Sequence, residues 1–513
     1  MKRYFNLGTF FNDIVDQHGD KEALATNQKQ ITYRELNALS NQLAYFLINQ
    51  GISKKDVVAI FNTKNSSGYA LMLACLKIGA VYVNLDSDNP AARLSKIIAS
   101  CKPKLLISDH SPSETLCNIA SQSKLPLKDI SDTTEFKNLP TSNGVITDKL
   151  VGSHPAYIMF TSGSTGVPKG VLISHENLLN FIGWTIERFG ITPEDRFAQL
   201  SPLYFDNSVF DFYTALFSGA CLVPISKETS KNPKSLVEAV DQQKCTVWFS
   251  VPSLLVYLLK MRVLSKSNMT SIGLIIFGGE GFPKGELKKL YELYADRASL
   301  VNVYGPTEGT CICSSYNIVD TDFEDMNKLA PLGVINPNFD YLIMNEHSTE
   351  VEAGEKGELC LIGPNVGLGY VNDKERTNNS FFQNPKVLSH REIIYKTGDL
   401  VYEKNGLLWF SGRVDNQIKH MGYRIELEEI ESALNGLGYI SQSAVLYIRV
   451  NVNYGKIIAF IATHENVDES TIKADLTDII PEYMIPSVIE IHEELPKNAN
   501  GKVDKKQLYD DAV

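Results

Sequence analysis

Short apolar runs alternate with longer amphipathic stretches along this 513-residue chain, and this alternation limits its fold more than any other feature. The stretch 33–50 has apolar residues at helical spacing and is followed by Gly51, which favours the end of a helix. Apolar runs of a length typical of buried strands lie at 56–62, 81–85, 104–108, 156–160, 221–225, 246–250 and 274–278. Strands separated by helices predict an α/β fold with largely parallel sheets.

The sequence changes in character after about residue 330. Short apolar runs are now separated by Gly, Asn and Asp, which indicates an antiparallel or barrel-like β piece. The last hundred or so residues alternate strands and helices again, and the polar, turn-prone stretch 412–416 precedes them. We therefore expect an α/β protein. Its large N-terminal domain, 1–411, holds two α/β subdomains with mixed sheets plus the barrel-like piece, and a small α+β C-terminal domain covers 417–513.

Composition and charge exclude several classes of protein. Hydrophobic residues make up 43% and charged residues 21% of the chain, which is ordinary for a soluble globular protein. The net charge is −11 and no run of about five Lys or Arg occurs, so neither nucleic-acid binding nor tRNA charging is indicated. No stretch of about 18 apolar residues predicts a membrane helix, and the N-terminal run is too broken for a signal peptide. The eight cysteines form no CxxC pair, which favours reduced thiols and a cytoplasmic location.

The segment TSGSTGVPKG, residues 161–170, follows the apolar run 156–160 and is rich in groups that bind phosphate. It does not fit the Walker pattern, because Pro168 stands where that pattern requires glycine. Its backbone can approach a ligand closely at two glycines, and it carries hydroxyl donors and one lysine. Taken alone, the segment fits a surface turn better than a phosphate-binding site. Its candidate phosphate-binding residues are Thr161, Ser162, Gly163, Ser164, Thr165, Gly166 and Lys169.

Four further blocks follow this segment in order: VNVYGPTEGT (301–310), YKTGDL (395–400), 412–431, and NANGKVDKKQL (498–508). Together the five blocks resemble the conserved motifs of the adenylate-forming superfamily, and the resemblance extends over nearly the whole chain. Within that superfamily the chain looks most like the amino-acid-activating members. These are the adenylation domains of nonribosomal peptide synthetases and the stand-alone D-alanine–carrier protein ligases.

The resemblance implies two half-reactions. An amino acid is first activated with ATP and Mg²⁺ to an aminoacyl-AMP, with release of pyrophosphate. The aminoacyl group then passes to the phosphopantetheine thiol of a carrier protein. Because no carrier segment follows block 498–508, we expect the carrier to be a separate partner. An acyl-CoA synthetase that uses coenzyme A is the alternative within the enzyme class, and a non-catalytic nucleotide-binding regulator is the alternative outside it.

The resemblance also assigns roles in ATP binding. Tyr304 would stack on adenine and Asn302 would meet its polar edge, whereas Asp399 would accept hydrogen bonds from the ribose hydroxyls. Glu308 would bind Mg²⁺, for which one carboxylate is enough because phosphate and water supply the other ligands. A core aromatic at Tyr304 and a turn aspartate at Asp399 are the structural alternatives. The ATP-binding set outside the loop is Asn302, Tyr304, Gly305, Thr307, Asp399 and Arg413.

Lys502, in NGKVD, corresponds to the lysine that stabilises charge on the α-phosphate during adenylation. Asp415 matches the hinge about which the small C-terminal domain of the family, a mobile lid, swings between the half-reactions. Lys419 and Gly422 lie in the block that faces the site in the second half-reaction. A β-hairpin with charged edges is the structural alternative for this block.

The segment YFDNSVFDFY (204–213) carries information about the acid that is activated. By resemblance, Asp206 pairs with the α-ammonium group of an amino acid, since a partner cation offsets the cost of burying a carboxylate. The residues expected around the substrate side chain are Asn207, Phe210, Phe249, Ile275, Phe277, Gly278, Val303, Cys311 and Ile312. Three Phe rings favour a small or compact substrate. D-alanine ligases carry cysteine where Gly278 stands, so glycine, alanine of either hand and other compact acids remain open.

Overall fold

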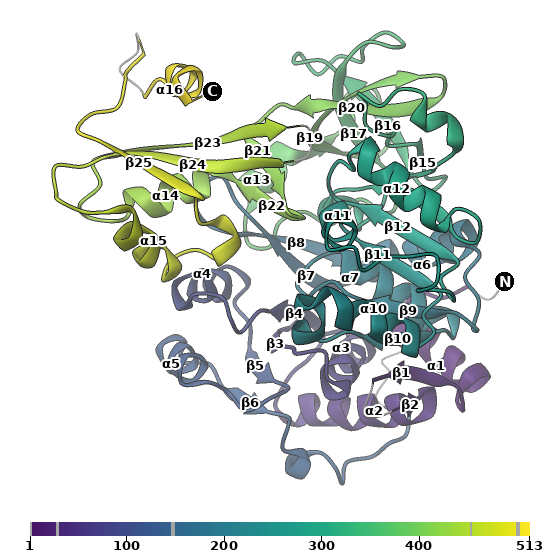
Figure 1. Ribbon diagram of the computed structural model, residues 1–513. Helices are drawn as coiled ribbons and strands as arrows, with labels where there is room; N and C mark the ends of the chain where they lie inside the picture. Colours follow the sequence, from purple (N-terminus) through teal and green to yellow (C-terminus); the bar gives the residue numbers. More distant parts are fainter. Residues whose placement is uncertain (1–2, 27–29, 145–148, 452–453, 499–502, 513) are drawn as a thin grey trace. The chain divides into compact units, whose positions relative to one another are not determined.

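The computed structural model describes residues 3–26, 30–144, 149–451, 454–498 and 503–512 (Figure 1). These residues divide into two compact units. The first unit comprises Met1–Ser87, Cys101–Met159 and Gly170–Val414. The second comprises Asp88–Ser100, Phe160–Lys169 and Asp415–Val513. The chain crosses between units at Val414, inside the expected boundary 412–416. The sequence pattern did not predict that Asp88–Ser100 and Phe160–Lys169 group with the C-terminal residues.

In the described chain, one sheet has six strands in the order β6-β5-β3-β4-β7-β8. Its strands are β3 (Val57–Phe61), β4 (Val81–Leu85), β5 (Leu105–Ser108), β6 (Leu127–Asp129), β7 (Pro155–Thr161) and β8 (Lys169–Ser174). The helices before β3 and β4 are α2 (Tyr33–Asn49) and α3 (Ser66–Ile78). Thr32 and Glu35 form a capping box that starts α2, and Gly79, at φ 73°, ends α3. The strand–helix alternation predicted for this region is confirmed.

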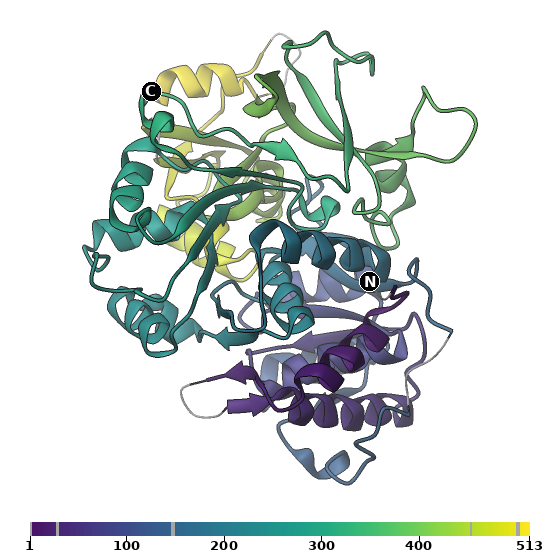
Figure 2. The ribbon, with the colours of Figure 1, turned by 90° about the vertical axis from the view of Figure 1, so that its right-hand side faces the viewer.

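The second large sheet has nine strands among the described residues, in the order β15-β14-β13-β12-β11-β9-β10-β1-β2. Its strands are β1 (Glu22–Ala25), β2 (Gln30–Thr32), β9 (Arg196–Gln199), β10 (Cys221–Pro224), β11 (Val247–Ser250), β12 (Leu274–Gly278), β13 (Ser299–Tyr304), β14 (Ser314–Asn317) and β15 (Val334–Ile335). Its central strands β9, β11, β12 and β13 are parallel. Figure 2 shows helices on both sides of this sheet. Their bounds are α6 (His175–Phe189), α10 (Pro233–Gln242), α11 (Pro252–Lys260) and α12 (Lys284–Tyr294).

The β piece expected after residue 330 is an antiparallel sheet of five strands within the described residues. Its strands are β16 (Asp340–Met344), β17 (Gly357–Ile362), β18 (Phe381–Gln383), β19 (Ile393–Lys404) and β20 (Leu407–Arg413). Strand β19 bulges against β17 within the TGD motif, where residues 397–399 lie opposite Leu359 alone. A bulge re-aims the neighbouring side chains, so it affects the direction of Asp399.

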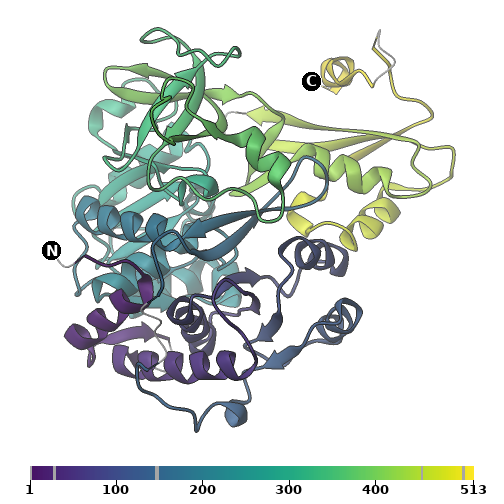
Figure 3. The ribbon, with the colours of Figure 1, turned by 180° about the vertical axis from the view of Figure 1, so that it is seen from behind.

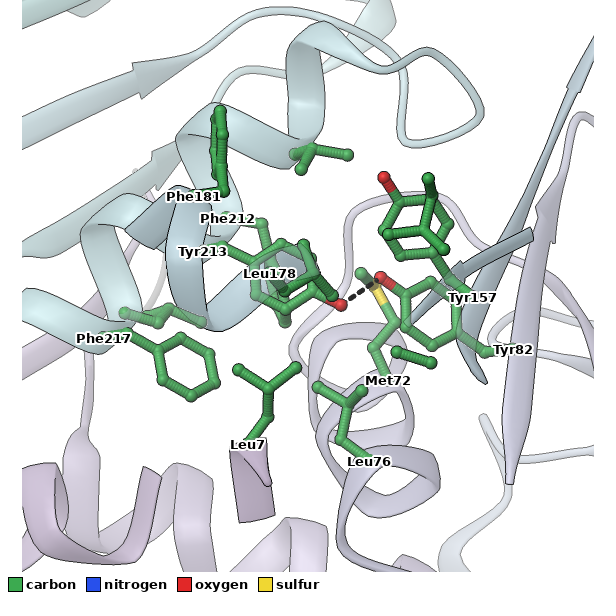
Figure 4. Close-up of a cluster of buried hydrophobic side chains, with 14 of the residues drawn as sticks. Leu7, Met72, Leu76, Tyr82, Tyr157, Leu178, Phe181, Phe212, Tyr213 and Phe217 are labelled. Atoms are coloured by element: carbon green, nitrogen blue, oxygen red, sulfur yellow. Dashed lines mark hydrogen bonds between the residues drawn. The ribbon is translucent and has the colours of Figure 1, made fainter. Parts of the chain in front are cut away.

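The main core of the first unit lies where helices of the two large sheets meet (Figure 4). The Tyr82 and Tyr213 hydroxyls share a 2.8 Å hydrogen bond there, drawn as a dashed line. Tyr213 lies on a π-helical turn, Phe210–Thr214, between α7 (Asn207–Val209) and α8 (Ala215–Ser218). π-Helical turns are rare overall, and those that occur are frequently found at functional sites. Among the described residues, none of the helices combines the length and apolar character that a membrane span needs.

The C-terminal part of the second unit is α+β, as predicted. Its sheet comprises β23 (Gln442–Asn451), β24 (Tyr454–Ala462) and β25 (Val488–His492). Figures 1 and 3 show α14 and α15 on one face of this sheet and α16 on the other. The helix bounds are α14 (Leu427–Asn435), α15 (Glu469–Thr477) and α16 (Lys505–Ala512). A hairpin of β21 (Gln417–His420) and β22 (Tyr423–Glu426) precedes α14.

Candidate active site

The loop that carries the candidate phosphate-binding residues connects β7 to β8, and residues 160–169 belong to the second unit. The amide of Gly163 donates a 3.1 Å hydrogen bond to Oε2 of Glu429 on α14. The other oxygen of this carboxylate pairs with Arg93, and both side chains are buried. The loop amide that resemblance assigns to phosphate therefore holds a carboxylate in this structure. This contact shows that the position accepts an anion.

The lysine of the loop is also paired with a carboxylate. The Lys169 ammonium lies 3.6 Å from Oε1 of Glu426, and both side chains are largely buried. Nearby, the Ser162 hydroxyl donates to the carbonyl oxygen of Arg424 over 2.7 Å. These contacts fit a loop whose cation and donors suit anionic groups, as expected for the phosphates of ATP.

The remaining residues of the loop form its turn. Gly166 has a φ of 73°, which favours glycine, and its amide donates to the carbonyl of Gly163 over 3.0 Å. Ser164 and Thr165 are exposed at the tip. The Thr161 hydroxyl is buried and has no hydrogen-bond partner within the described part of the chain. A buried hydroxyl of this kind can serve a ligand.

Three side chains meet at the expected ribose site. Tyr304, at the end of β13, donates a 2.6 Å hydrogen bond from its hydroxyl to Oδ2 of Asp399. Arg413 donates to Oδ1 of the same carboxylate over 2.6 Å. Burial, reinforced by the Asp399 charge, raises the pKa of Tyr304 well above its usual value. Tyr304 is therefore a protonated donor at neutral pH, and Asp399 is the buried charge that organises the group.

Two neighbouring positions have backbone roles. Asn302 was expected to meet the adenine edge, and its side-chain amide donates to the carbonyl of Pro331 over 2.8 Å. Gly305 follows Tyr304, and a Cβ atom there would lie 2.3 Å from the carbonyl oxygen of Cys311. Only glycine allows this close approach, which brings the turn after β13 against the residues that follow Glu308.

The residues expected to contact the α-phosphate and the amino acid lie side by side. The Thr307 hydroxyl donates a 2.6 Å hydrogen bond to Oδ2 of Asp206. Thr307 is buried on the short 3₁₀ helix Thr307–Gly309, and Asp206 is half-buried at the start of α7. This bond joins the turn after β13 to the segment 204–213. The buried side-chain nitrogen of Asn207, next to Asp206, has no hydrogen-bond partner in the described residues, so it suits a substrate group.

Glu308 is fully buried, and its Oε1 accepts a 2.8 Å hydrogen bond from the Tyr370 hydroxyl. Its main-chain oxygen accepts a second bond, from the amide of Gly367, over 2.8 Å. The described residues hold no group of three or more potential metal ligands among His, Cys, Asp and Glu. A single oriented carboxylate nevertheless fits Mg²⁺, because that ion usually keeps waters and binds substrate phosphates. Tyr370 and Gly367 were missed because they lie some sixty residues away in the sequence.

Most of the residues expected around the substrate side chain gather in one cluster. Phe210 and Phe249 meet edge to face, with ring centroids 5.4 Å apart and an interplanar angle of 84°. Val303, Cys311 and Ile312 are buried in the same core cluster. Burial, together with the charge of the nearby Asp206, raises the pKa of the Cys311 thiol well above its usual value. The Cys311 thiol is therefore neutral and contributes a small side chain to this cluster.

Two of the expected lining residues lie elsewhere. Ile275 and Phe277 pack in the core on the other face of β12, where Phe277 meets Phe282 edge to face at 4.9 Å. Because side chains alternate along a strand, Ile276 faces the cluster that contains Phe249 instead. We therefore remove Ile275 and Phe277 from the proposed lining and place Ile276 there.

Gly278 ends β12 beside Val303 of β13. A Cβ atom at residue 278 would lie 2.3 Å from the carbonyl oxygen of Val303 and 2.7 Å from its Cγ2. The cysteine that resemblance places at this position in D-alanine ligases does not fit unless β13 shifts. Glycine at residue 278, where the resemblance places cysteine in D-alanine ligases, therefore goes together with the close approach of β12 and β13.

The hinge and hairpin residues are described in the second unit. Oδ1 of Asp415 accepts a 3.3 Å hydrogen bond from the amide of Gln417. Lys419 lies on β21, and Gly422, with a φ of 83°, forms the turn that leads into β22. The hairpin that was the structural alternative is therefore present, and it is compatible with the catalytic role. Lys502 lies outside the described residues.

Two buried ionisable residues, Lys64 and Asp211, were missed by the sequence analysis. The Lys64 ammonium donates to the main-chain oxygens of Gln199, Leu200 and Ile225 over 2.9–3.2 Å. Burial lowers its pKa to about 7, against the opposing charge of Asp211. Burial in turn raises the pKa of Asp211. Asp211 lies in the segment 204–213, which the sequence analysis singled out. Lys64 follows β3 as an isolated lysine, and no motif around it indicated a buried role.

Comparison with protein families identifies the class to which this site belongs. Residues 11–371 match the family "AMP-binding enzyme", and residues 429–502 match "AMP-binding enzyme C-terminal domain". The chain therefore belongs to the AMP-binding enzyme family and is an AMP-forming ligase that uses ATP. The resemblance to the adenylate-forming superfamily and the predicted α/β fold class are confirmed.

Curated relatives narrow the class. The chain is 34% identical over 500 residues to the D-alanine–D-alanyl carrier protein ligase of Bacillus mycoides, covering 96% of this chain and 97% of the relative. The Bacillus cytotoxicus ligase of the same name is equally similar, with the same coverage. Among solved structures, an artificially fused adenylation–carrier di-domain, NpsA-ThdA from Klebsiella oxytoca, has a TM-score of 0.80 at 25% identity, covering 96% of this chain and 94% of its own. The Vibrio cholerae adenylation domain AlmE, in complex with glycyl-adenosine-5′-phosphate, shares the fold with a TM-score of 0.84 at 24% identity, covering 100% and 99%.

Proposed function

We propose that this enzyme activates an amino acid with little or no side chain and transfers it to a separate carrier protein. In the first step a carboxylate oxygen attacks the α-phosphorus of ATP. The bond from that phosphorus to the bridging oxygen breaks, and pyrophosphate leaves. In the second step the carrier's phosphopantetheine thiol loses its proton and attacks the carbonyl carbon, and AMP leaves. The hydrogen bond between Thr307 and Asp206 carries this proposal, since it sets the ammonium partner beside the α-phosphate contact.

The charge of the site supports an amino acid over a fatty acid or a simple aryl acid. Asp206 is a half-buried carboxylate whose charge acts on Cys311, a member of the apolar cluster that contains Phe210 and Phe249. A substrate ammonium group would offset the cost of burying this charge, whereas an acid without a cation leaves that cost uncompensated. The Bacillus relatives, named as D-alanine ligases, support the same class of substrate.

The packing of the pocket supports a small side chain. Phe210 and Phe249 meet edge to face in the cluster expected around the substrate side chain, and Cys311 and Ile312 are buried in the same cluster. Glycine and alanine suit this volume, whereas a larger side chain would displace a packed ring at a cost of about 1–3 kcal/mol.

The roles in ATP binding rest on the family resemblance, and the contacts described within each unit support them. Asp399, held by Tyr304 and Arg413, would receive the ribose hydroxyls, and Lys169 would hold the terminal phosphates. Glu308 would hold Mg²⁺, which when bound would neutralise phosphate charge. Lys502 would lie against the α-phosphate, where an ammonium group stabilises the transition state more than the ground state.

Amino-acid-dependent pyrophosphate exchange tests the first step. We expect exchange with glycine or with one enantiomer of alanine, weaker exchange with serine, and none with phenylalanine or lysine. Exchange with no amino acid would overturn the proposal. The second step is tested by offering the enzyme either a phosphopantetheinylated D-alanyl carrier protein from a Bacillus relative or free coenzyme A. Thioester should form on the carrier, and equal use of coenzyme A would favour the acyl-CoA synthetase alternative.

A further inference from the structure

The segment 366–371 lies between β17 and α13 (Lys374–Ser380) and holds Glu308 at two atoms. The amide of Gly367 donates to the main-chain oxygen of Glu308, and the Tyr370 hydroxyl donates to its Oε1, each over 2.8 Å. The first bond fixes where the backbone of the 3₁₀ turn lies. The second fixes how the carboxylate is rotated. The same short segment therefore controls both the position and the orientation of Glu308.

The segment is also paired with the strand that leaves the phosphate loop. Leu368 donates its amide to the carbonyl of Leu172 over 2.8 Å, and Val371 donates to the carbonyl of Gly170 over 2.8 Å. Val171 and Tyr370 form an antiparallel bridge between these bonds. Tyr370 thus lies on a piece of chain that is hydrogen-bonded both to β8 and to the turn that carries Glu308.

The ring of Tyr370 is itself held in place. It is buried, and it meets Phe381 edge to face with centroids 5.6 Å apart. The Tyr370 amide donates to the Thr377 hydroxyl over 2.9 Å. Gly369 has a φ of 108°, and a Cβ there would lie 2.5 Å from Cγ2 of Thr377, so only glycine permits this turn. The Tyr370 side chain is therefore not free to rotate away, and its hydroxyl stays directed at Glu308.

From this geometry we propose that Tyr370 is a positioning residue that orients the Glu308 carboxylate for a divalent cation. The inference rests on the proposed function, in which Glu308 binds Mg²⁺. Mg²⁺ demands near-octahedral geometry, so a carboxylate that rotates freely is a poorer ligand than one held at one oxygen. Loss of a group that orients a metal ligand typically costs roughly 10–100-fold in metal affinity.

The test is the Mg²⁺ dependence of Tyr370→Phe, which keeps the ring against Phe381 and removes only the hydroxyl. We expect the Mg²⁺ concentration for half-maximal pyrophosphate exchange to rise about 10-fold or more, with the rate recovering at high Mg²⁺. Thermal stabilisation by a non-hydrolysable ATP analogue should need correspondingly more Mg²⁺. Tyr33→Phe is the matched control: its buried hydroxyl donates to the carbonyl of Ala220 over 2.6 Å, so it loses a comparable bond elsewhere. Its Mg²⁺ curve should match the wild type.

Glu308→Gln separates failure of this inference from failure of the function on which it rests. If Glu308→Gln leaves the Mg²⁺ dependence of analogue binding unchanged, Glu308 is not the metal ligand and that part of the proposed function is wrong. If Glu308→Gln shifts the dependence and Tyr370→Phe does not, the role of Tyr370 is overturned. A drop in rate for Tyr370→Phe that excess Mg²⁺ does not recover would also count against it.

Discussion

The Thr307 hydroxyl donates a 2.6 Å hydrogen bond to Oδ2 of Asp206. Thr307 follows the central strand β13, whereas Asp206 lies at the start of α7. The group expected at the α-phosphate and the group expected at the substrate ammonium are thus in direct contact. The Thr307 hydroxyl therefore fixes the direction of the Asp206 carboxylate.

Replacing Asp206 with Asn removes the charge and keeps the shape. Because the substrate ammonium then enters a partly buried site without a counter-charge, we expect amino-acid-dependent exchange to fall about 100-fold, or roughly 3 kcal/mol. Binding of a fluorescent ATP analogue should stay close to wild type. A parallel loss of analogue binding would contradict an ammonium-binding role for Asp206.

The buried ion pair between Arg413 and Asp399 provides a second test. Asp399→Asn leaves the Arg413 guanidinium without this charge partner, so we expect urea denaturation to show a loss of about 3 kcal/mol in the free energy of unfolding. The ATP concentration for half-maximal exchange should rise, while that of the amino acid changes little. Arg413→Lys should not behave as wild type, because Nη1 of Arg413 contacts both Asp399 and the carbonyl of Thr397, and an ammonium group is hydrated more strongly than a guanidinium.

Phe249 and Phe277 form a matched pair, because both are buried and they lie in core clusters on opposite faces of the sheet. Each change to Ala should cost about 3–5 kcal/mol of stability, measured by chemical denaturation. Only Phe249→Ala should open the pocket and allow exchange with leucine or methionine. If Phe277→Ala broadens the substrate range instead, the original assignment of Phe277 to the lining was right.

The pH dependence of stability should contain a contribution from His175, the first residue of α6. Its Nδ1 accepts a 3.2 Å hydrogen bond from the amide of Leu7, and burial lowers its pKa from 6.5 to about 3. Between these pH values the unfolded chain binds a proton that the native chain does not. Stability from this residue is therefore complete above pH 6.5 and falls by about 1.4 kcal/mol per pH unit below it.

His175→Gln isolates that contribution. Glutamine keeps an oxygen that can accept the Leu7 amide but does not titrate in this range. Urea denaturation at pH 7, 6 and 5 should show a shallower loss for the variant than for the wild type. Identical slopes would mean that His175 is protonated in the native protein.

Lys502 lies outside the described residues, so its role remains a prediction from the resemblance. Lys502→Ala should abolish pyrophosphate exchange, because the ammonium group expected at the α-phosphate is lost. The variant should keep the wild-type circular dichroism spectrum and should still transfer an aminoacyl group from supplied aminoacyl-AMP to the carrier. Lys505→Ala is the control, because Lys505 pairs with Glu431 on α14. Near wild-type exchange by Lys502→Ala would falsify the role.

The sequence predicted the strands well because hydrophobic runs report burial directly. It failed on which side chain faces which layer. β12 is an almost continuous apolar run, and a strand buried on both faces shows no alternation from which its orientation can be read. Ile275 and Phe277 were assigned to the lining by resemblance alone, and they pack in the core cluster on the other face of β12. Contacts such as Tyr370 with Glu308 were invisible because they join distant parts of the chain, and no local pattern encodes them.

The close approach of Gly278 to Val303 also bears on how the substrate range of such enzymes diverges. A cysteine at residue 278 requires a different path for the neighbouring strand, so exchanging that one residue does not convert one pocket into the other. The two changes are epistatic: the strand must move before the side chain is tolerated. Exchanging residue 278 alone should therefore fail to transfer a substrate preference, because the backbone of β13 has to change with it.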